Sequence, residues 1–159
     1  MGLDMYLKAK RAHWTSRFDG SDFHDPSPFS EALKKVPVPK AFACKFPEVV
    51  ECEAMYWRKA NAIHNWFVEN VQEGEDDCGS YHVSIDKLKA LRDTVREALG
   101  DVDKAEELLP TLGGCFFGST EYGEGYWHDL EKTDKSLTAI LEIPEEELKQ
   151  WSFEYQSSW

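Results

Sequence analysis

The segment from residue 56 to residue 67 holds the side chains best suited to binding chemistry. Within twelve positions it carries the basic pair Arg58 and Lys59, two amides, an imidazole and several large rings. Residues three apart share one face of a helix, so Arg58, Asn61 and His64 are expected to form a polar ridge. A guanidinium fork fits phosphate or carboxylate, and aromatic rings stack on bases. The ridge therefore predicts a site for an anionic, nucleotide-like ligand.

The candidate ligand-binding residues extend beyond this ridge to further rings and one acidic side chain. The full set is Trp57, Arg58, Lys59, Asn61, His64, Trp66, Asp77 and Trp127. The same segment also fits a second interpretation, in which the polar residues form a buried network that fixes a strand-to-helix corner. Trp57 and Trp66 would then belong to the core. The sequence leaves both interpretations open.

A glycine-rich turn from residue 113 to residue 125 precedes an expected helix. Glycines before a helix N-terminus can expose backbone N–H groups to an anion. The turn lacks the Lys-Ser/Thr ending of a P-loop, and Glu121 and Glu124 would repel phosphate. A conformational role for these glycines is therefore favoured, and residues 113–118 are expected to form a short buried strand or a tight turn.

Few residues that could bind a metal ion are spaced as the ligands of a metal site usually are. Cys78 and His82 supply two ligands of a tetrahedral zinc site, and Cys115 or His128 would have to complete it from far along the chain. The four cysteines form no Cys-x-x-Cys pair. We therefore expect reduced thiols, no bound metal and no cofactor.

Charge is distributed unevenly along the chain of 159 residues, whose net charge is −12. Residues 1–70 carry ten Lys or Arg against nine Asp or Glu, and residues 71–159 carry eight against twenty-one. An acidic half disfavours direct binding to nucleic acid, which requires cations that neutralise phosphates. It favours solubility or a basic partner protein, which Glu121, Glu124, Asp129 and Glu131 could contact.

The sequence predicts a folded protein of the cytoplasm. Hydrophobic residues make up 42% and aromatic residues 13% of the chain, too much for a disordered polypeptide. No secretory segment and no apolar run of about 18 residues is present, so we expect no membrane insertion. Tyr6 stands where a myristoylation signal needs Ser or Thr, so no lipid anchor is expected.

Hydrophobic periodicity predicts the secondary structure. Alternation with period two predicts strands, and stripes with a helical period predict helices. Strands are expected at 3–9, 49–56, 81–83 and 153–159, and helices at about 60–74, 85–99, 101–109 and from about 126. Ser84 is expected to cap the helix at 85–99, with Leu88, Leu91, Val95 and Leu99 facing the core. We predict an α+β fold in which a mainly antiparallel sheet includes both chain termini, with three to four helices packed on it.

Residues 13–40 are expected to form a long loop. Gly20 and four prolines interrupt any regular pattern there, and only Ser30 to Lys35 suggests a single helical turn. Long loops in compact domains are often functional. We expect one domain over residues 1–159, with this loop as a lid or a partner-binding arm.

Several blocks of the sequence occur in a fixed order along nearly the whole chain. They are MGLDMYL at 1–7, YWRK at 56–59 followed by His64, Asp77-Cys78, LPT at 109–111 leading to FFG at 116–118, and YQSSW at 155–159. In these blocks the chain resembles a family of small proteins encoded by bacteriophages and prophages, mostly of unassigned function. The resemblance implies a phage accessory protein in the host bacterial cytoplasm, with Arg58, Lys59, His64, Asp77 and Cys78 as matching polar positions. Cys115 stands where similar proteins often have a third Phe.

The residues and the resemblance together predict a non-enzymatic accessory protein that sequesters an anionic, nucleotide-like small molecule. If that molecule is an immune signal, the protein is a counter-defence sponge. One alternative is an acidic inhibitor that binds a host defence protein. Another is a nucleotide-modifying enzyme, with His64 as general acid or base and Asp77 orienting it or a metal. A homo-oligomer is compatible with each of these functions.

Overall fold

The computed structural model describes residues 2–13, 27–42 and 47–159. The chain divides into two compact units, one made of residues 1–9 and 53–159 and the other of residues 10–52. The first unit contains the candidate site.

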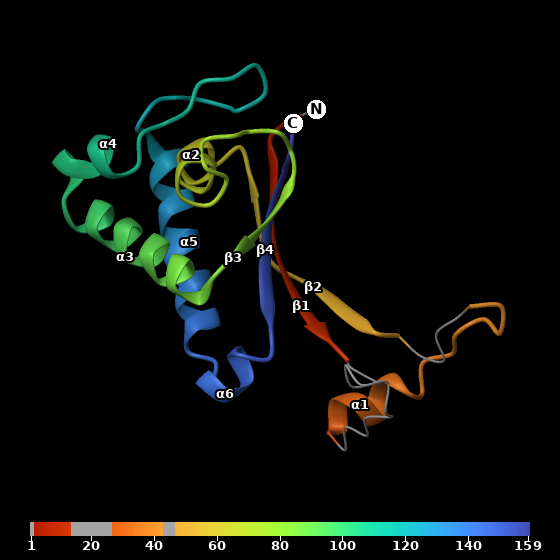
Figure 1. The fold of residues 1–159 in the computed structure, drawn as a ribbon. Helices are drawn as coiled ribbons and strands as arrows, with labels where there is room; N and C mark the ends of the chain where they lie inside the picture. The colour runs from red at the N-terminus through yellow and green to blue at the C-terminus, as the bar shows by residue number, and fades with distance from the viewer. Residues whose placement is uncertain (1, 14–26, 43–46) are drawn as a thin grey trace. The chain divides into compact units, whose positions relative to one another are not determined.

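The sheet is four-stranded and antiparallel. Its strands are β1 (Asp4–Ala12), β2 (Val49–Arg58), β3 (Ser80–Val83) and β4 (Ser152–Ser158), in the spatial order β2-β1-β4-β3. In the β3–β4 register, Tyr81 lies opposite Tyr155 and Val83 opposite Phe153. The first and last strands are therefore central, as Figure 1 shows. The predicted α+β fold with both ends of the chain in one sheet is confirmed.

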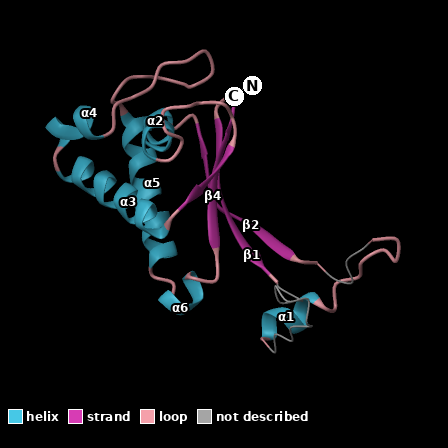
Figure 2. Ribbon diagram, viewed as in Figure 1, coloured by secondary structure: helices cyan, strands magenta, loops and turns pink. Residues whose placement is uncertain are grey.

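Three longer helices lie together on one side of this sheet (Figures 1 and 2). They are α2 (Asn61–Asn70), α3 (Ile85–Gly100) and α5 (Glu124–Leu141), joined by the short η1 (Val102–Lys104) and α4 (Ala105–Leu108), with α6 (Glu145–Leu148) before β4. α3 and α5 pack against each other. Apolar residues of β1 alternate with polar ones, so Leu3, Met5 and Leu7 enter the core beneath the helices.

Helix α3 follows its expected pattern with one change. Ser84 caps it, because the side-chain oxygen accepts a hydrogen bond from the Lys87 N–H at 3.2 Å. Leu88, Leu91 and Val95 are buried as predicted. Ala98 completes the buried stripe, and Leu99 is only partly buried. Both positions lie close to the same helical face.

The strand-to-helix corner differs from the expected polar ridge. β2 continues through Arg58, and Lys59 adopts the left-handed conformation with φ 61° before α2 begins at Asn61. The Lys59 N–H donates to the Leu3 carbonyl at 2.8 Å, which keeps this stretch paired with the start of β1. Arg58 is therefore a strand residue, and the predicted helical ridge through Arg58, Asn61 and His64 is not formed. Side-chain periodicity does not reveal the left-handed conformation of Lys59, which separates Arg58 on the strand from Asn61 and His64 on the helix.

The glycine-rich segment forms a turn and no strand, and α5 begins at Glu124, two residues earlier than expected. Gly118 has φ 89°, which favours glycine, and a Cβ there would lie 3.1 Å from the Lys59 Cβ. The turn at Gly118 and the left-handed Lys59 are therefore packed against each other. This close approach brings the loop before α5 onto the start of α2.

The unit of residues 10–52 contains α1 (Pro28–Leu33). This helix begins two residues before the single turn expected from the sequence. The Ser27 side chain caps it by accepting from the Ser30 N–H at 3.2 Å. The Arg11 guanidinium lies 4.0 Å from the centre of the Phe29 ring. Residues 14–26 of the expected long loop lie outside the described residues.

Within the described ranges, no helix combines the length and the hydropathy needed to cross a bilayer.

Candidate functional site

A cavity of about 540 Å³ lies where the starts of α2 and α5 meet the loop before α5, and we call it the α2/α5 cavity. Its volume lies within the range of about 300 to 1,000 Å³ typical of small-molecule sites. Its walls come from two stretches that are far apart in the sequence, residues 58–63 and residues 111–130. The lining residues are 58–63 at the β2–α2 corner, Thr111, Gly118, Ser119 and Glu121 in the loop, and Gly123, Glu124, Gly125, Tyr126, His128, Asp129 and Leu130 on α5 and just before it.

Both helices that start at this cavity lack a side-chain cap. The N-cap residues are Ala60 for α2 and Gly123 for α5, and neither has a side chain that can accept a hydrogen bond. The other two helices of six or more residues in the described chain have serine caps, Ser27 for α1 and Ser84 for α3. The Asn61 N–H bonds to the Lys59 carbonyl at 2.9 Å, and the other first-turn N–H groups of α2 and α5 have no side-chain cap. The positive ends of two helix dipoles thus lie at one cavity.

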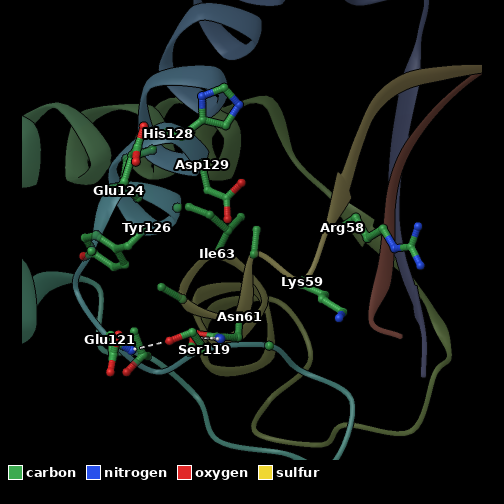
Figure 3. Close-up of a pocket in the computed structure, with 17 residues that line it drawn as sticks. Arg58, Lys59, Asn61, Ile63, Ser119, Glu121, Glu124, Tyr126, His128 and Asp129 are labelled. Atoms are coloured by element: carbon green, nitrogen blue, oxygen red, sulfur yellow. Dashed lines mark hydrogen bonds between the residues drawn. The ribbon is translucent and has the colours of Figure 1, made fainter. Parts of the chain in front are cut away.

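Charged side chains of both signs surround the cavity. In Figure 3 the Asp129 carboxylate extends from α5 toward Ile63 on α2, whereas the charged ends of Arg58 and Lys59 extend away from it. Burial raises the pKa of the Asp129 carboxyl, and the charges of His128 and Lys132 oppose that rise. The cavity thus combines an acidic group inside with two cations at its edge, of which Arg58 lies 3.9 Å from the Asp4 carboxylate.

Asn61 holds the loop wall of the cavity in place. Its Nδ2 donates to the carbonyls of Phe117 at 3.1 Å and Ser119 at 2.8 Å. Its Oδ1 accepts from the Leu112 N–H at 3.2 Å. The side chain is only 4% exposed, so these three bonds satisfy most of its capacity. Asn61 lines the cavity, but its amide is committed to the loop.

His64, on α2, belongs to a buried hydrogen-bonded network with Tyr155 and Asp76. Its Nδ1 lies 2.7 Å from the Tyr155 hydroxyl, and its Nε2 lies 2.9 Å from Asp76 Oδ2. The carboxylate can only accept, so we assign the proton to Nε2, and the Tyr155 hydroxyl donates to Nδ1. Asp76 also accepts from the Trp159 indole N–H at 3.1 Å. His64 is fully buried, and burial, followed by the charge of Asp76, raises the pKa of Tyr155.

The three candidate tryptophans have different environments. Trp57 is fully buried, and its indole N–H donates to the Thr133 hydroxyl at 2.8 Å. Trp66 is also buried in the core. Trp127 is half-buried on α5 and lines a second hollow. Among these three rings, only Trp127 offers a surface that a ligand can reach.

The eight candidate residues therefore do not form one site, and Trp127 lies at the second hollow. Arg58, Lys59 and Asn61 line the α2/α5 cavity. His64, Trp57 and Trp66 are buried in the core instead, and the ring nitrogens of His64 lie against Tyr155 and Asp76. Asp77 is exposed, and its carboxylate accepts from the Gly79 N–H at 2.8 Å, which lowers its pKa.

Sequence reasoning missed the uncapped helix starts at Ala60 and Gly123. The sequence did contain a hint, because neither of these two residues is a Ser, Thr, Asp or Asn, the types that usually cap a helix.

Within residues 2–13, 27–42 and 47–159, no group of three or more His, Cys, Asp or Glu side chains is placed to hold a metal ion. Cys78 is half-buried at a left-handed backbone position, and His82 is exposed on β3. Cys52, Cys78 and Cys115 are free thiols, and Cys44 lies outside the described residues.

The fold and the cavity define an α+β protein with a cavity at two helix starts. No protein-family model, no curated protein and no solved structure matches this chain.

We expect Asp129→Asn to stabilise the protein at pH 7. The folded state raises the pKa of this carboxyl above its ordinary value of 3.8, so ionised Asp129 opposes folding. That cost is absent below pH 3.8 and develops as the pH rises through the folded pKa. Urea unfolding of both proteins between pH 3 and 8 should therefore show an advantage of the variant that grows with pH and then becomes constant. An advantage that does not change with pH would contradict this role of Asp129.

Proposed function

We propose that this protein is a non-enzymatic binding protein that holds an anionic, nucleotide-like small molecule in the α2/α5 cavity. The observation that carries the proposal is the pair of uncapped helix starts on one cavity of ligand size. Backbone N–H groups bind phosphate oxygens without any side chain, and the glycines of this wall leave room for close approach. Lys59 and Arg58 at the edge add a favourable potential for an anion.

The carboxylates of the cavity narrow the class of ligand. Glu121 and Asp129 accept hydrogen bonds, so they suit a ligand that carries hydroxyl or amino donors as well as an anionic group. A simple polyanion would meet repulsion from these two carboxylates and from Glu124, which also lines the cavity. A nucleotide satisfies both requirements, because its phosphate is anionic and its sugar and base carry donors.

The arrangement favours binding over catalysis. Among the described cavity residues, the Thr111 hydroxyl donates to the Thr120 carbonyl at 3.1 Å, and the Ser119 hydroxyl accepts from the Glu121 N–H at 3.1 Å. Neither is hydrogen-bonded to His128 or to a carboxylate, as an activated nucleophile requires. The proposed protein therefore captures its ligand and releases it unchanged.

The phage resemblance suggests where such capture is useful. A cytoplasmic protein that sequesters a nucleotide immune signal acts as a counter-defence sponge, and this is the role we propose. The alternative of an acidic inhibitor relied on Glu121, Glu124, Asp129 and Glu131. Three of these four residues line the α2/α5 cavity, so we favour the small ligand over a basic protein surface.

Gly123→Asp provides a test that separates binding from folding. A Cβ at Gly123 would meet nothing within 4 Å, and the backbone is extended with φ −94°, so the substitution is sterically free. The introduced carboxylate caps α5 and occupies the position of the anion. Stability should stay constant or rise by about 0.5 kcal/mol, while affinity for the ligand falls by about tenfold or more.

A thermal-shift screen of wild type identifies the ligand among inorganic phosphate, mononucleotides, dinucleotides and cyclic oligonucleotides, because a bound compound raises the melting temperature. Titration calorimetry then compares wild type, Gly123→Asp and the control Ala139→Glu. The control adds the same charge to exposed α5 surface, about 24 Å along the helix at 1.5 Å per residue. It should bind like wild type. If no compound in the screen stabilises wild type, or if Gly123→Asp binds normally, the proposal is wrong.

A further inference from the structure

A second hollow adjoins the α2/α5 cavity over the first turns of α5. It is lined by Glu124, Gly125, Trp127, His128 and Glu131. Three of these residues, Glu124, Gly125 and His128, also line the α2/α5 cavity. A single ligand that occupies the cavity can therefore extend across the start of α5 into the second hollow.

Trp127 gives this hollow an aromatic wall of defined orientation. The ring packs edge-on against Tyr126, with centroids 5.0 Å apart and planes at 89°. Tyr126 is itself anchored, because its hydroxyl donates to the Leu109 carbonyl at 3.0 Å. A ring held in this way loses little freedom when a base stacks on it.

Two carboxylates stand on either side of the ring. Glu124 and Glu131 lie three residues before and four residues after Trp127, so all three share one face of α5. Both carboxylates are exposed and accept hydrogen bonds only. They therefore favour a flat group that carries N–H donors, as an amino-bearing base does. Uracil and thymine offer a single ring N–H and no amino group, so they satisfy fewer of these acceptors.

We propose that the second hollow binds the amino-bearing base of the ligand, stacked on Trp127 with its N–H groups toward Glu124 and Glu131. The inference rests on the proposed function, because the phosphate of the same ligand occupies the α2/α5 cavity. The ligand class is then a nucleotide of adenine, guanine or cytosine. Trp127 provides the stacking energy, and Glu131 provides the preference among bases.

Calorimetry with AMP, GMP, UMP and inorganic phosphate tests this arrangement in wild type, Trp127→Ala, Trp127→Phe and Glu131→Gln. Wild type should bind AMP or GMP at least tenfold more tightly than UMP or phosphate. Trp127→Ala should lose at least tenfold in affinity for AMP or GMP and keep its affinity for phosphate, and Trp127→Phe should recover part of the loss. Glu131→Gln, an exposed change, should reduce the preference for AMP or GMP over UMP.

The results distinguish the two proposals. Retained phosphate binding in Trp127→Ala shows that the variant is folded. Equal binding of all four compounds by wild type, or unchanged AMP and GMP binding in Trp127→Ala, would overturn the base site and leave the anion site standing. Absence of any binding by wild type, phosphate included, would overturn both.

Discussion

Replacing His64 with alanine is expected to lower the free energy of unfolding by about 4 kcal/mol. The substitution removes a fully buried ring and leaves the Tyr155 hydroxyl and one oxygen of Asp76 without their partner. For a chain of this length, the melting temperature should fall by about 8 to 16 °C. Thermal and urea unfolding, followed by far-UV circular dichroism, measure the loss.

Tyr155→Phe is the matched control, because it removes only the hydroxyl of the same hydrogen bond. It should cost about 1 kcal/mol. In the double variant the two effects should not add, since each change removes the same contact. Strict additivity, or a His64→Ala cost no larger than that of Tyr155→Phe, would show that the network does not support the fold.

Asn61→Asp is expected to cost about 3 kcal/mol at pH 7, although the two side chains have nearly the same shape. The two Nδ2 bonds to the carbonyls of Phe117 and Ser119 are lost, and a buried carboxylate then faces those oxygens. The loop over residues 111–119 should loosen with it. Amide hydrogen exchange should show faster exchange at Leu112, whose N–H is bonded to Asn61.

The pH dependence identifies the cause. Protonation of the introduced carboxyl restores one donor and removes the charge, so part of the stability should return as the pH falls. Asn61→Ala, which carries no charge, should show a deficit that changes little with pH. If Asn61→Asp is as stable as wild type at pH 7, the three bonds of Asn61 do not hold the loop.

The positions of the strands and helices were largely predictable from periodicity. Alternation in β1 and β4 placed both in the sheet, and the serine before α3 marked its start, because burial of one face requires these spacings. The errors lie at boundaries. β1 and β2 extend beyond the expected ends, and α1 and α5 each begin two residues early.

The candidate site was predictable only in part. Arg58, Lys59 and Asn61 were recognisable as polar residues near one another, and they do line the cavity. The roles of Asn61 and His64 were not recognisable, because Asn61 bonds to the Phe117 carbonyl 56 residues away and His64 to the Tyr155 hydroxyl 91 residues away. A polar residue in the sequence is equally compatible with a ligand and with a buried partner.

Local patterns in the sequence thus determined the fold class, the strands at both ends of the chain and the helices that cover the sheet. Tertiary structure alone decided which polar groups remain available to a ligand. The left-handed backbone at Lys59, packed against Gly118, directs α2 so that it starts beside α5. As a result Ala60 and Gly123, the N-cap residues of the two helices, line one cavity. This placement matters because a backbone N–H at a helix start is available to a ligand only where no side chain satisfies it.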